Sequence, residues 1–172
     1  MTDATMEVKT LLESKWDPTK VVDRNDTQVL TDTPTIHTGA YDRDGPKPVI
    51  AISGKDEGPT SGGQTGLYGL AASGLGMQLI GGGLNIDFVA GTRADCKGVG
   101  TGVDTNPNPK KVRQSMYDHG AQLLLDHQRS TELRTIVPGD SREIEDSDDG
   151  PTIYRIQCRA QFLYERDPTP TA

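Results

Sequence analysis

The chain has 172 residues, which supports a single domain, because two halves would each approach the lower size limit for an independent core. Its formal net charge of -7 argues against a general nucleic-acid surface, which needs a basic field to displace counterions from phosphates. No run of about 18 apolar residues is present, so the sequence predicts no membrane-spanning helix. The aspartate-rich composition with few aromatic residues suits a protein that works at high salt.

The amino terminus, MTDATMEVKT, has neither a basic start nor an apolar stretch. We therefore expect no signal peptide and synthesis in the cytoplasm. The two cysteines, Cys96 and Cys158, are too few for a disulfide scaffold and form no CxxC pair. Cys158 falls in the apolar register of an expected strand, and we interpret it as a small core residue.

The first expected element is a helix over residues 3–16. Apolar side chains recur there every four positions, with Leu11 beside them, and form one stripe: Ala4, Val8, Leu12 and Trp16. Pro18 ends this helix, because the residue before a proline is pushed out of the helical region. Residues 34–38 and 47–53 follow as short predicted strands.

Residues 54–83 differ in composition from the rest of the chain. Eleven of these 30 positions are glycine, and no charged residue occurs between Glu57 and Asp87. Glycine at this density disfavours both a helix and a regular strand, so we expect an insertion without a stable element of its own. We predict that residues 58–83 form an assembly arm that becomes ordered against another subunit, with a disordered surface loop as the alternative. The predicted interface residues are Leu67, Tyr68, Leu70, Leu75, Met77, Leu79 and Ile80.

Regular structure is expected to resume at Leu84. In LNIDFVA, residues 84–90, apolar side chains alternate with Asn85 and Asp87, which predicts a half-buried strand. A long helix is expected over residues 109–128, with Asn108 as its N-cap and a proline at its first position. Its predicted buried face comprises Val112, Met116, Tyr117, Ala121, Leu123 and Leu124, and its predicted outer face comprises Lys110, Lys111 and Arg113.

Three further strands complete the expected fold. Residues 131–137 and 141–146 are predicted strands joined by a turn at residues 138–140, and residues 152–164 form the last strand. The last strand has the clearest two-residue period, with one apolar face predicted as core and one polar face predicted as wet and cationic. The apolar positions are Tyr154, Ile156, Cys158, Ala160, Phe162 and Tyr164, and the polar positions are Arg155, Gln157, Arg159 and Gln161.

This order of elements predicts a single α+β domain over residues 1–166. We expect a mixed or mostly antiparallel sheet, covered on one face by the long helix and the N-terminal helix, with the glycine-rich insertion at residues 54–83. A flexible tail at residues 167–172 follows the domain.

No set of residues predicts catalysis. His37, His119 and His127 lack further ligands at matched spacing, and neither an HExxH pattern nor a cysteine cluster occurs, so we expect no metal. The glycine-rich segment has no GK[ST] and no complete GxGxxG, which disfavours nucleotide binding. Carboxylates at residues 143–149 lack the spacing of a calcium loop, and we interpret them as a solvated hairpin tip. We therefore expect no cofactor and no enzymatic activity.

The C-terminal two thirds of the chain resembles the tail terminator proteins of tailed viruses, also called tail-completion or head–tail joining proteins. The resemblance covers residues 84–166, in element order and texture rather than in a diagnostic motif. It rests on LNIDFVAGTRAD, then the proline-capped NPNPKKVRQSMYDHGAQLLLDHQ, then TELRTIVPGDSREIED and TIYRIQCRAQFLYER. The acidic composition favours a virus of salt-loving archaea. The glycine-rich insertion departs from the compact pattern of the family.

The resemblance implies an α/β sandwich whose subunits form a six-fold ring in the virion. In that family the ring caps the last ring of tail-tube protein and docks onto the neck below the portal, while DNA passes through its centre without sequence-specific binding. On this hypothesis Arg155, Gln157, Arg159 and Gln161 face the channel or an adjoining ring, with ordinary solvent exposure as the alternative. The resemblance carries over no catalytic residues. The alternatives are another neck protein, such as a head–tail adaptor or head-completion protein, and a small cytoplasmic binding module or enzyme of a halophile.

Overall fold

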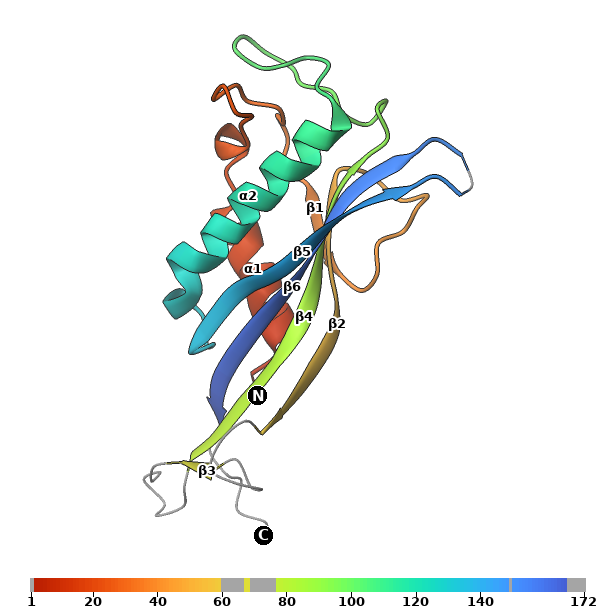
Figure 1. Ribbon diagram of the computed structural model, residues 1–172. Coiled ribbons are helices and arrows are strands. Elements are labelled where there is room, and N and C mark those ends of the chain that lie inside the picture. The colour runs from red at the N-terminus through yellow and green to blue at the C-terminus, as the bar shows by residue number, and fades with distance from the viewer. Residues whose placement is uncertain (1, 60–66, 69–76, 149, 167–172) are drawn as a thin grey trace.

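The computed structural model describes residues 2–59, 67–68, 77–148 and 150–166. One mixed sheet forms its centre, with the strand order β1-β2-β4-β6-β5 and with β3 paired to β4 outside this path. β1 is parallel to β2, and the other pairings are antiparallel. Two helices cover one face of the sheet (Figure 1). The predicted α+β class and mixed sheet are confirmed.

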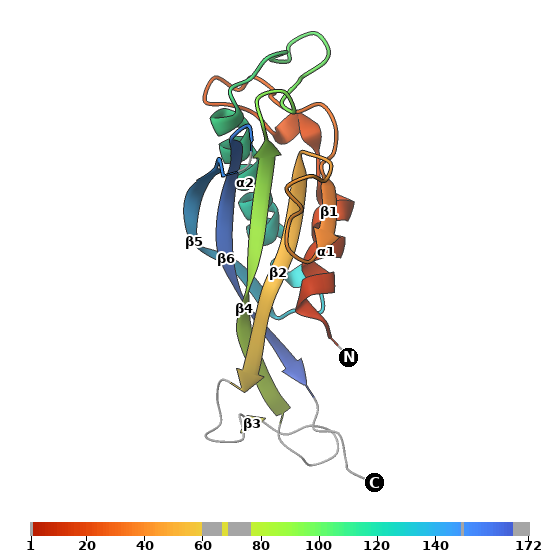
Figure 2. The ribbon, with the colours of Figure 1, turned by 90° about the vertical axis from the view of Figure 1, so that its right-hand side faces the viewer.

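The helices are α1 (Ala4–Lys15) and α2 (Pro109–His127), each followed by a 3-10 turn, η1 (Pro18–Lys20) and η3 (Gln128–Ser130). The strands are β1 (Thr35–Thr38), β2 (Val49–Pro59), β3 (Leu67–Tyr68), β4 (Met77–Gly91), β5 (Thr135–Asp146) and β6 (Ile153–Arg166). β2, β4 and β6 continue past the helical layer toward β3 (Figures 1 and 2).

Both helices begin and end close to the predicted positions. The Asp3 side chain accepts a hydrogen bond from the N–H of Thr5 at 3.0 Å, and the Asn108 side chain accepts one from the N–H of Lys110 at 3.0 Å. These contacts satisfy amide donors that have no partner within the first turn of a helix. The predicted apolar stripe of α1 is buried, and α1 packs on β1 and β2 while α2 packs on β4, β5 and β6.

The structure corrects the prediction that Arg113 faces outward. Arg113 is 2% exposed, and its guanidinium donates to the carbonyl of Ile144 at 3.3 Å and to the carboxylate of Glu143 at 3.1 Å. The long side chain crosses from α2 to β5 and lies 5.6 Å from the centre of the Tyr154 ring. Glu145 forms a 3.3 Å ion pair with Lys110. Part of the acidic stretch at residues 143–149 is therefore bound to α2 and is not simply a solvated tip.

The prediction that residues 54–83 lack a regular strand is wrong at both ends of that segment. Residues 54–59 belong to β2 and residues 77–83 to β4, because Glu57 pairs with Gly82 and Gly58 pairs with Gly81 in an antiparallel ladder. Pairing with neighbouring strands here overrides the poor strand preference of glycine. A Cβ atom on Gly82 would lie 1.8 Å from the carbonyl oxygen of Asp56, so only glycine fits there. Residues 60–66 and 69–76 lie outside the described residues.

The predicted turn at residues 138–140 is also corrected. β5 continues through these residues beside β6, and the register shifts between Pro138 and Ser141, which marks a bulge. A Cβ atom on Gly139 would lie 2.4 Å from the carbonyl oxygen of Arg159, so the glycine allows the close approach. The alternation of the last strand is confirmed, because its predicted core positions from Ile156 to Tyr164 are buried.

Gly120 sets the distance between α2 and the sheet. A Cβ atom at this position would lie 2.4 Å from Cε1 of Phe88, closer than real Cβ contacts allow. We expect Gly120→Ala to lower the free energy of unfolding by about 1–3 kcal/mol through overpacking, although alanine is the better helix former. Urea unfolding followed by circular dichroism measures this change. Gln114→Ala, at an exposed position of the same helix, is the control, and equal stability of the two variants would contradict the packing argument.

His119 joins the end of α1 to α2. Its Nε2 atom accepts a hydrogen bond from the backbone N–H of Asp17 at 3.2 Å, and its ring centre lies 4.6 Å from that of Trp16. Burial lowers the pKa of His119 from the usual 6.5, and the Asp17 carboxylate opposes this effect. A protonated ring has no lone pair at Nε2, so the hydrogen bond needs the neutral form.

We expect stability to fall as pH drops below the unfolded pKa of His119. Because the pKa in the folded state is below 6.5, the unfolded chain binds the proton more tightly. The stabilisation is therefore complete above that value and is lost as pH falls toward the folded pKa. Urea midpoints measured over about pH 7.5 to 5 test this. His119→Gln keeps an acceptor without titrating, and an equally steep decline in that variant would rule out His119 as the cause.

Candidate functional site

The face of the sheet opposite the helices, here called the open face, carries the predicted polar row of β6. Arg155, Gln157, Arg159 and Gln161 alternate on β6 with the buried residues that face the helices. Their neighbours on β4 are, in the same order, Val89, Asp87, Asn85 and Gly83. The open face is therefore the surface on which the predicted channel or ring contacts must be assessed.

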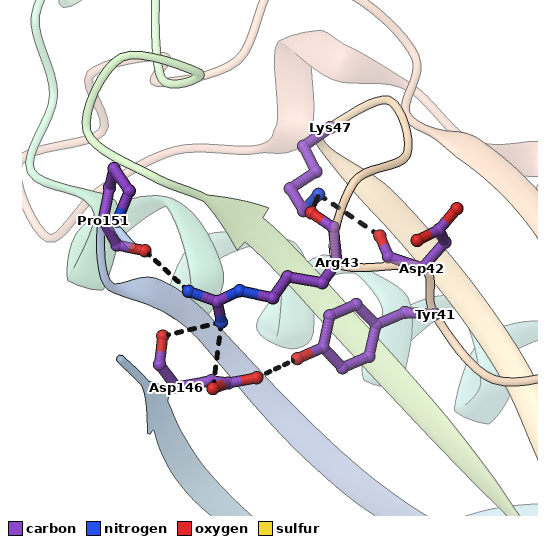
Figure 3. A network of polar contacts seen from close by, with 6 residues as sticks. All are labelled: Tyr41, Asp42, Arg43, Lys47, Asp146 and Pro151. Atoms are coloured by element: carbon purple, nitrogen blue, oxygen red, sulfur yellow. Dashed lines mark hydrogen bonds and ion pairs between the residues drawn. The ribbon is translucent and has the colours of Figure 1, made fainter. Parts of the chain in front are cut away.

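One end of the open face is covered by the loop at residues 39–48. The hydroxyl of Tyr41 donates to Asp146 at 2.6 Å, and Arg43 forms an ion pair with the same carboxylate at 2.9 Å (Figure 3). Arg43 also donates to the carbonyl of Pro151 at 3.2 Å. The Tyr41 hydrogen bond, with help from Arg43, lowers the pKa of Asp146. These contacts bind the loop to the ends of β5 and β6.

Lys47 stabilises the conformation of the same loop through hydrogen bonds to its backbone carbonyls. Its ammonium group donates to the carbonyls of Asp42 at 3.2 Å and Arg43 (Figure 3). It also donates to the carbonyl of Gly45 at 2.9 Å. Beneath the loop, Tyr41 packs against a small apolar cluster of Val49, Val89 and Ile153 on the open face. This end of the open face is therefore closed by the chain itself.

Arg155 lies under this loop and is bound within the subunit. Its side chain is 17% exposed, forms an ion pair with the buried carboxylate of Asp87, and lies 4.8 Å from the centre of the Tyr41 ring. Gln157 donates to the second oxygen of Asp87 at 3.4 Å. The first half of the predicted polar row is thus engaged in contacts with β4 and the loop.

Arg159 lies flat across β4 toward β2. It donates to the carbonyl of Gly54 at 2.9 Å and to the side chain of Asn85 at 3.2 Å, and it forms an ion pair with Asp56 at 2.8 Å. A Cβ atom on Gly83 would lie 2.7 Å from Nε of Arg159, so the glycine makes room for the guanidinium. The side chain of Arg159 is 36% exposed.

The face is therefore not cationic in the way that the sequence predicts. Arg155 and Arg159 are each paired with a carboxylate from a neighbouring strand, and these pairings offset their charges. The prediction counted charges along β6 alone, whereas the neutralising groups come from β2 and β4. The solvent exposure of Arg159 and Gln161 agrees with the prediction, and their facing a channel remains a prediction.

Beyond Arg159 the open face holds a groove of about 650 Å³ at the end away from the loop. Gly81 and Gly83 contribute no side chains to its floor, and Val137 and Leu163 supply apolar surface beside it. Val137 is 43% exposed, although it is a large hydrophobic residue on a strand. This end of the face combines apolar surface with the Asp56–Arg159 ion pair.

The predicted interface residues separate into four groups. Ile80 is 2% exposed within the main core, which corrects its assignment to an interface: the side chain packs inside the subunit, because β4 continues through this position. Leu79 is half-buried on β4, and Met77 begins that strand. Leu67 and Tyr68 form β3, which pairs with residues 77–78. Leu70 and Leu75 lie outside the described residues.

Metal binding has no support in the residues that the structure describes. No group of three or more histidine, cysteine, aspartate or glutamate side chains there could hold a metal ion. Cys96 and Cys158 are buried, and burial raises the pKa of Cys96 to about 12, which disfavours a thiolate nucleophile. None of the helices in the described residues combines the length and the apolar composition of a membrane span.

Sequence reasoning missed two features: the contacts of the loop on the open face, and the burial of Arg113 between α2 and β5. The Tyr41–Arg43–Asp146 contacts join residues about a hundred positions apart, and no local pattern indicates them. The burial of Arg113 could have been predicted, because its spacing to Met116, Gly120 and Leu124 places all four residues on one face of a helix.

No protein-family model matches the chain, and no curated protein gives a significant match.

The buried ion pair between Asp87 and Arg155 gives a test of how the open face is held. We expect Asp87→Leu to destabilise the chain by about 3–5 kcal/mol, because it leaves a largely buried guanidinium without its counter-charge. The double variant Asp87→Leu with Arg155→Met should recover most of this loss. Urea unfolding of all four forms of the cycle measures the coupling. A double variant as unstable as the sum of the two single variants would contradict a direct pair.

Proposed function

We propose that this chain is a structural virion protein that forms a homohexameric ring at the head–tail junction, terminates the tail tube and joins it to the neck. The ring would contact the tail-tube protein on one side and neck proteins on the other, with DNA passing through its centre. The proposal comes from the resemblance of residues 84–166 to tail terminator proteins. The arrangement of the sheet supports it, as follows.

The observation that carries the proposal is the extension of the sheet past the helices. β2 and β4 continue to Pro59 and Met77 (Figure 1), and the uncharged, glycine-rich segment 60–76 connects them in the sequence. β6 supports this extension, because Arg166 pairs with Gln78. The parts of β2, β4 and β6 that extend beyond the helices are here called the stalk. Because strands flank β4 on both sides, the stalk is a rigid support for a segment that contacts another subunit. A ligand-binding module has no need of this extension.

The pairing of charges on the open face fits the passage of DNA. Protein surfaces that hold DNA do so with unpaired lysine and arginine side chains, which release counterions from the phosphates. Arg155 and Arg159 are instead paired with Asp87 and Asp56. If this face lines the channel, the pairing would let DNA move past without being held.

Reconstruction of the intact virion tests the proposal. We expect this chain as a ring between the tail tube and the neck. A position in another ring of the neck would support the head–tail adaptor or head-completion alternative. Absence from the virion, together with a monomer that binds a small molecule in solution, would support the binding module or small enzyme and overturn the proposal.

Replacement of residues 60–76 by a short Gly-Ser linker tests the assembly arm. We expect the variant to fold, because the main core, including Ile80, lies outside the replaced segment. It should fail to assemble or to join tails, because the apolar contacts with the next subunit are gone. Circular dichroism checks folding, and electron microscopy with purified tails checks joining. Normal joining by the folded variant would count against the arm.

A further inference from the structure

Within the residues that the structure describes, several stretches of strand have a sheet neighbour on one side only. β1 pairs with β2 alone, and one stretch of β2 and one of β5 share this property. β1 pairs with β2 along residues 49–52 alone, so residues 55–59 of β2 have β4 on one side and no described strand on the other. Figure 2 shows β1 beside only the upper part of β2. β5 has β6 on one side and no described strand on the other. Such edges offer backbone N–H and C=O groups to a strand from another chain.

The remaining part of each edge is covered by the chain itself. On β2, β1 covers residues 49–52. On β5, α2 covers the second half, where Arg113 donates to the carbonyl of Ile144 at 3.3 Å and Lys110 contacts Glu145 at 3.3 Å. The available stretches are therefore residues 55–59 of β2 and residues 135–138 of β5.

The register places these two stretches at the same level of the sheet. The row through Thr135 crosses to Leu163 on β6, then to Gly81 on β4 and to Gly58 on β2. Three antiparallel pairings separate β5 from β2, so these two strands run in opposite directions. Rotation of a second copy about an axis along the strands would bring its β2 beside β5 in antiparallel orientation. Antiparallel pairing is the commoner arrangement in sheets.

The side chains beside the two stretches carry opposite charges. A hollow of about 410 Å³ at the start of β5 is lined in part by Arg129 and Arg134, both exposed. Arg134 also contacts Glu165 of its own chain at 2.9 Å. The β2 stretch presents Asp56, whose side chain is 74% exposed and is paired with Arg159, and Glu57, which lies 3.7 Å from Lys55 of the same stretch. Lys55, Asp56 and Glu57 together leave this stretch with a net charge of -1. Complementary charge of this kind guides two surfaces into register.

We propose that residues 135–138 of β5 pair antiparallel with residues 55–59 of β2 in a second copy of this chain. The sheet would then continue from one subunit to the next. This inference rests on the proposed function and deepens it, because one edge meeting a different edge is the heterologous contact that a closed ring requires. Pro59 and Pro138 have no N–H to donate and limit the pairing to a few residues.

Cysteine cross-linking between two variants directly tests whether Thr135 of one copy lies beside Gly58 of the next. Thr135→Cys and Gly58→Cys lie in one row, and a Cβ atom at Gly58 meets nothing within 4 Å, so that substitution fits the fold. The native Cys96 and Cys158 are 2% and 1% exposed and do not compete. We expect oxidation of the mixed variants to give disulfide-linked dimers, and oxidation of either variant alone to give few. A chain with both cysteines should give a ladder of oligomers.

Arg142→Cys mixed with Gly58→Cys is the matched control, because residue 142 lies seven positions along β5 from residue 135, about 23 Å away. Dimers from the Thr135→Cys mixture that are no more frequent than in this control, at the highest soluble concentration, would overturn the edge pairing. If the unmodified chain forms a ring while this result is obtained, only the edge pairing fails and the proposed function stands. If the unmodified chain also stays monomeric with purified tail tubes, both fail.

A charge placed on the edge gives a second test that does not depend on oxidation. Gly58→Lys should abolish assembly while leaving the thermal midpoint unchanged, because lysine on a strand edge opposes pairing with another strand. Val99→Lys, in a loop where Val99 is 72% exposed, should leave both assembly and the midpoint unchanged. Rings formed by Gly58→Lys at the unmodified level would overturn the proposed pairing.

Discussion

The fold depends on the pairing of β4 with a strand on each side. β6 pairs with it from Gln78 to Gly91, and β2 pairs with it over most of the same length. This double pairing fixes the backbone of a strand that has three consecutive glycines, Gly81, Gly82 and Gly83. On the helical face the same strand supplies Leu84, Ile86 and Phe88 to the core. On the open face its small or polar residues leave room for side chains from β6 to lie across it.

Because β4 is held in this way, the two ends of the open face differ. At one end the loop at residues 39–48 is bound to Asp146 and covers Arg155. At the other end Arg159, Gln161 and Val137 remain accessible beside a floor of glycine backbone. Contacts with other molecules are therefore favoured at the end where the sheet extends beyond the helices. The stalk therefore carries both the groove beside Arg159 and the one-sided strand edge at residues 55–59 of β2.

Local patterns in the sequence predicted the helices, the alternation of β6 and the α+β class, because each depends on periodicity and capping within a few residues. Asn108 and the stripe from Ala4 to Trp16 are clear examples. The glycine-rich ends of β2 and β4 could not be predicted in this way, since their strand conformation depends on partners distant in sequence. In the sequence, residues 138–140 look like a turn, because β6, the strand whose pairing shows them to be a bulge in β5, is distant in sequence. On the candidate surface, the alternation identified the row on β6, but the carboxylates that neutralise it come from other strands.

The burial of ion pairs has a consequence for the effect of salt on this protein. At about 1 M salt the Debye length is about 3 Å, so attraction between solvent-exposed charges is largely screened. The Lys9–Glu13 pair on α1 and the Arg134–Glu165 pair are of this exposed kind. The pair between Asp87 and Arg155 is shielded from mobile ions by the strands and by Tyr41. In concentrated brine the loop end of the open face would therefore keep the Asp87–Arg155 pair, while exposed pairs, Asp56–Arg159 among them, lose much of their attraction.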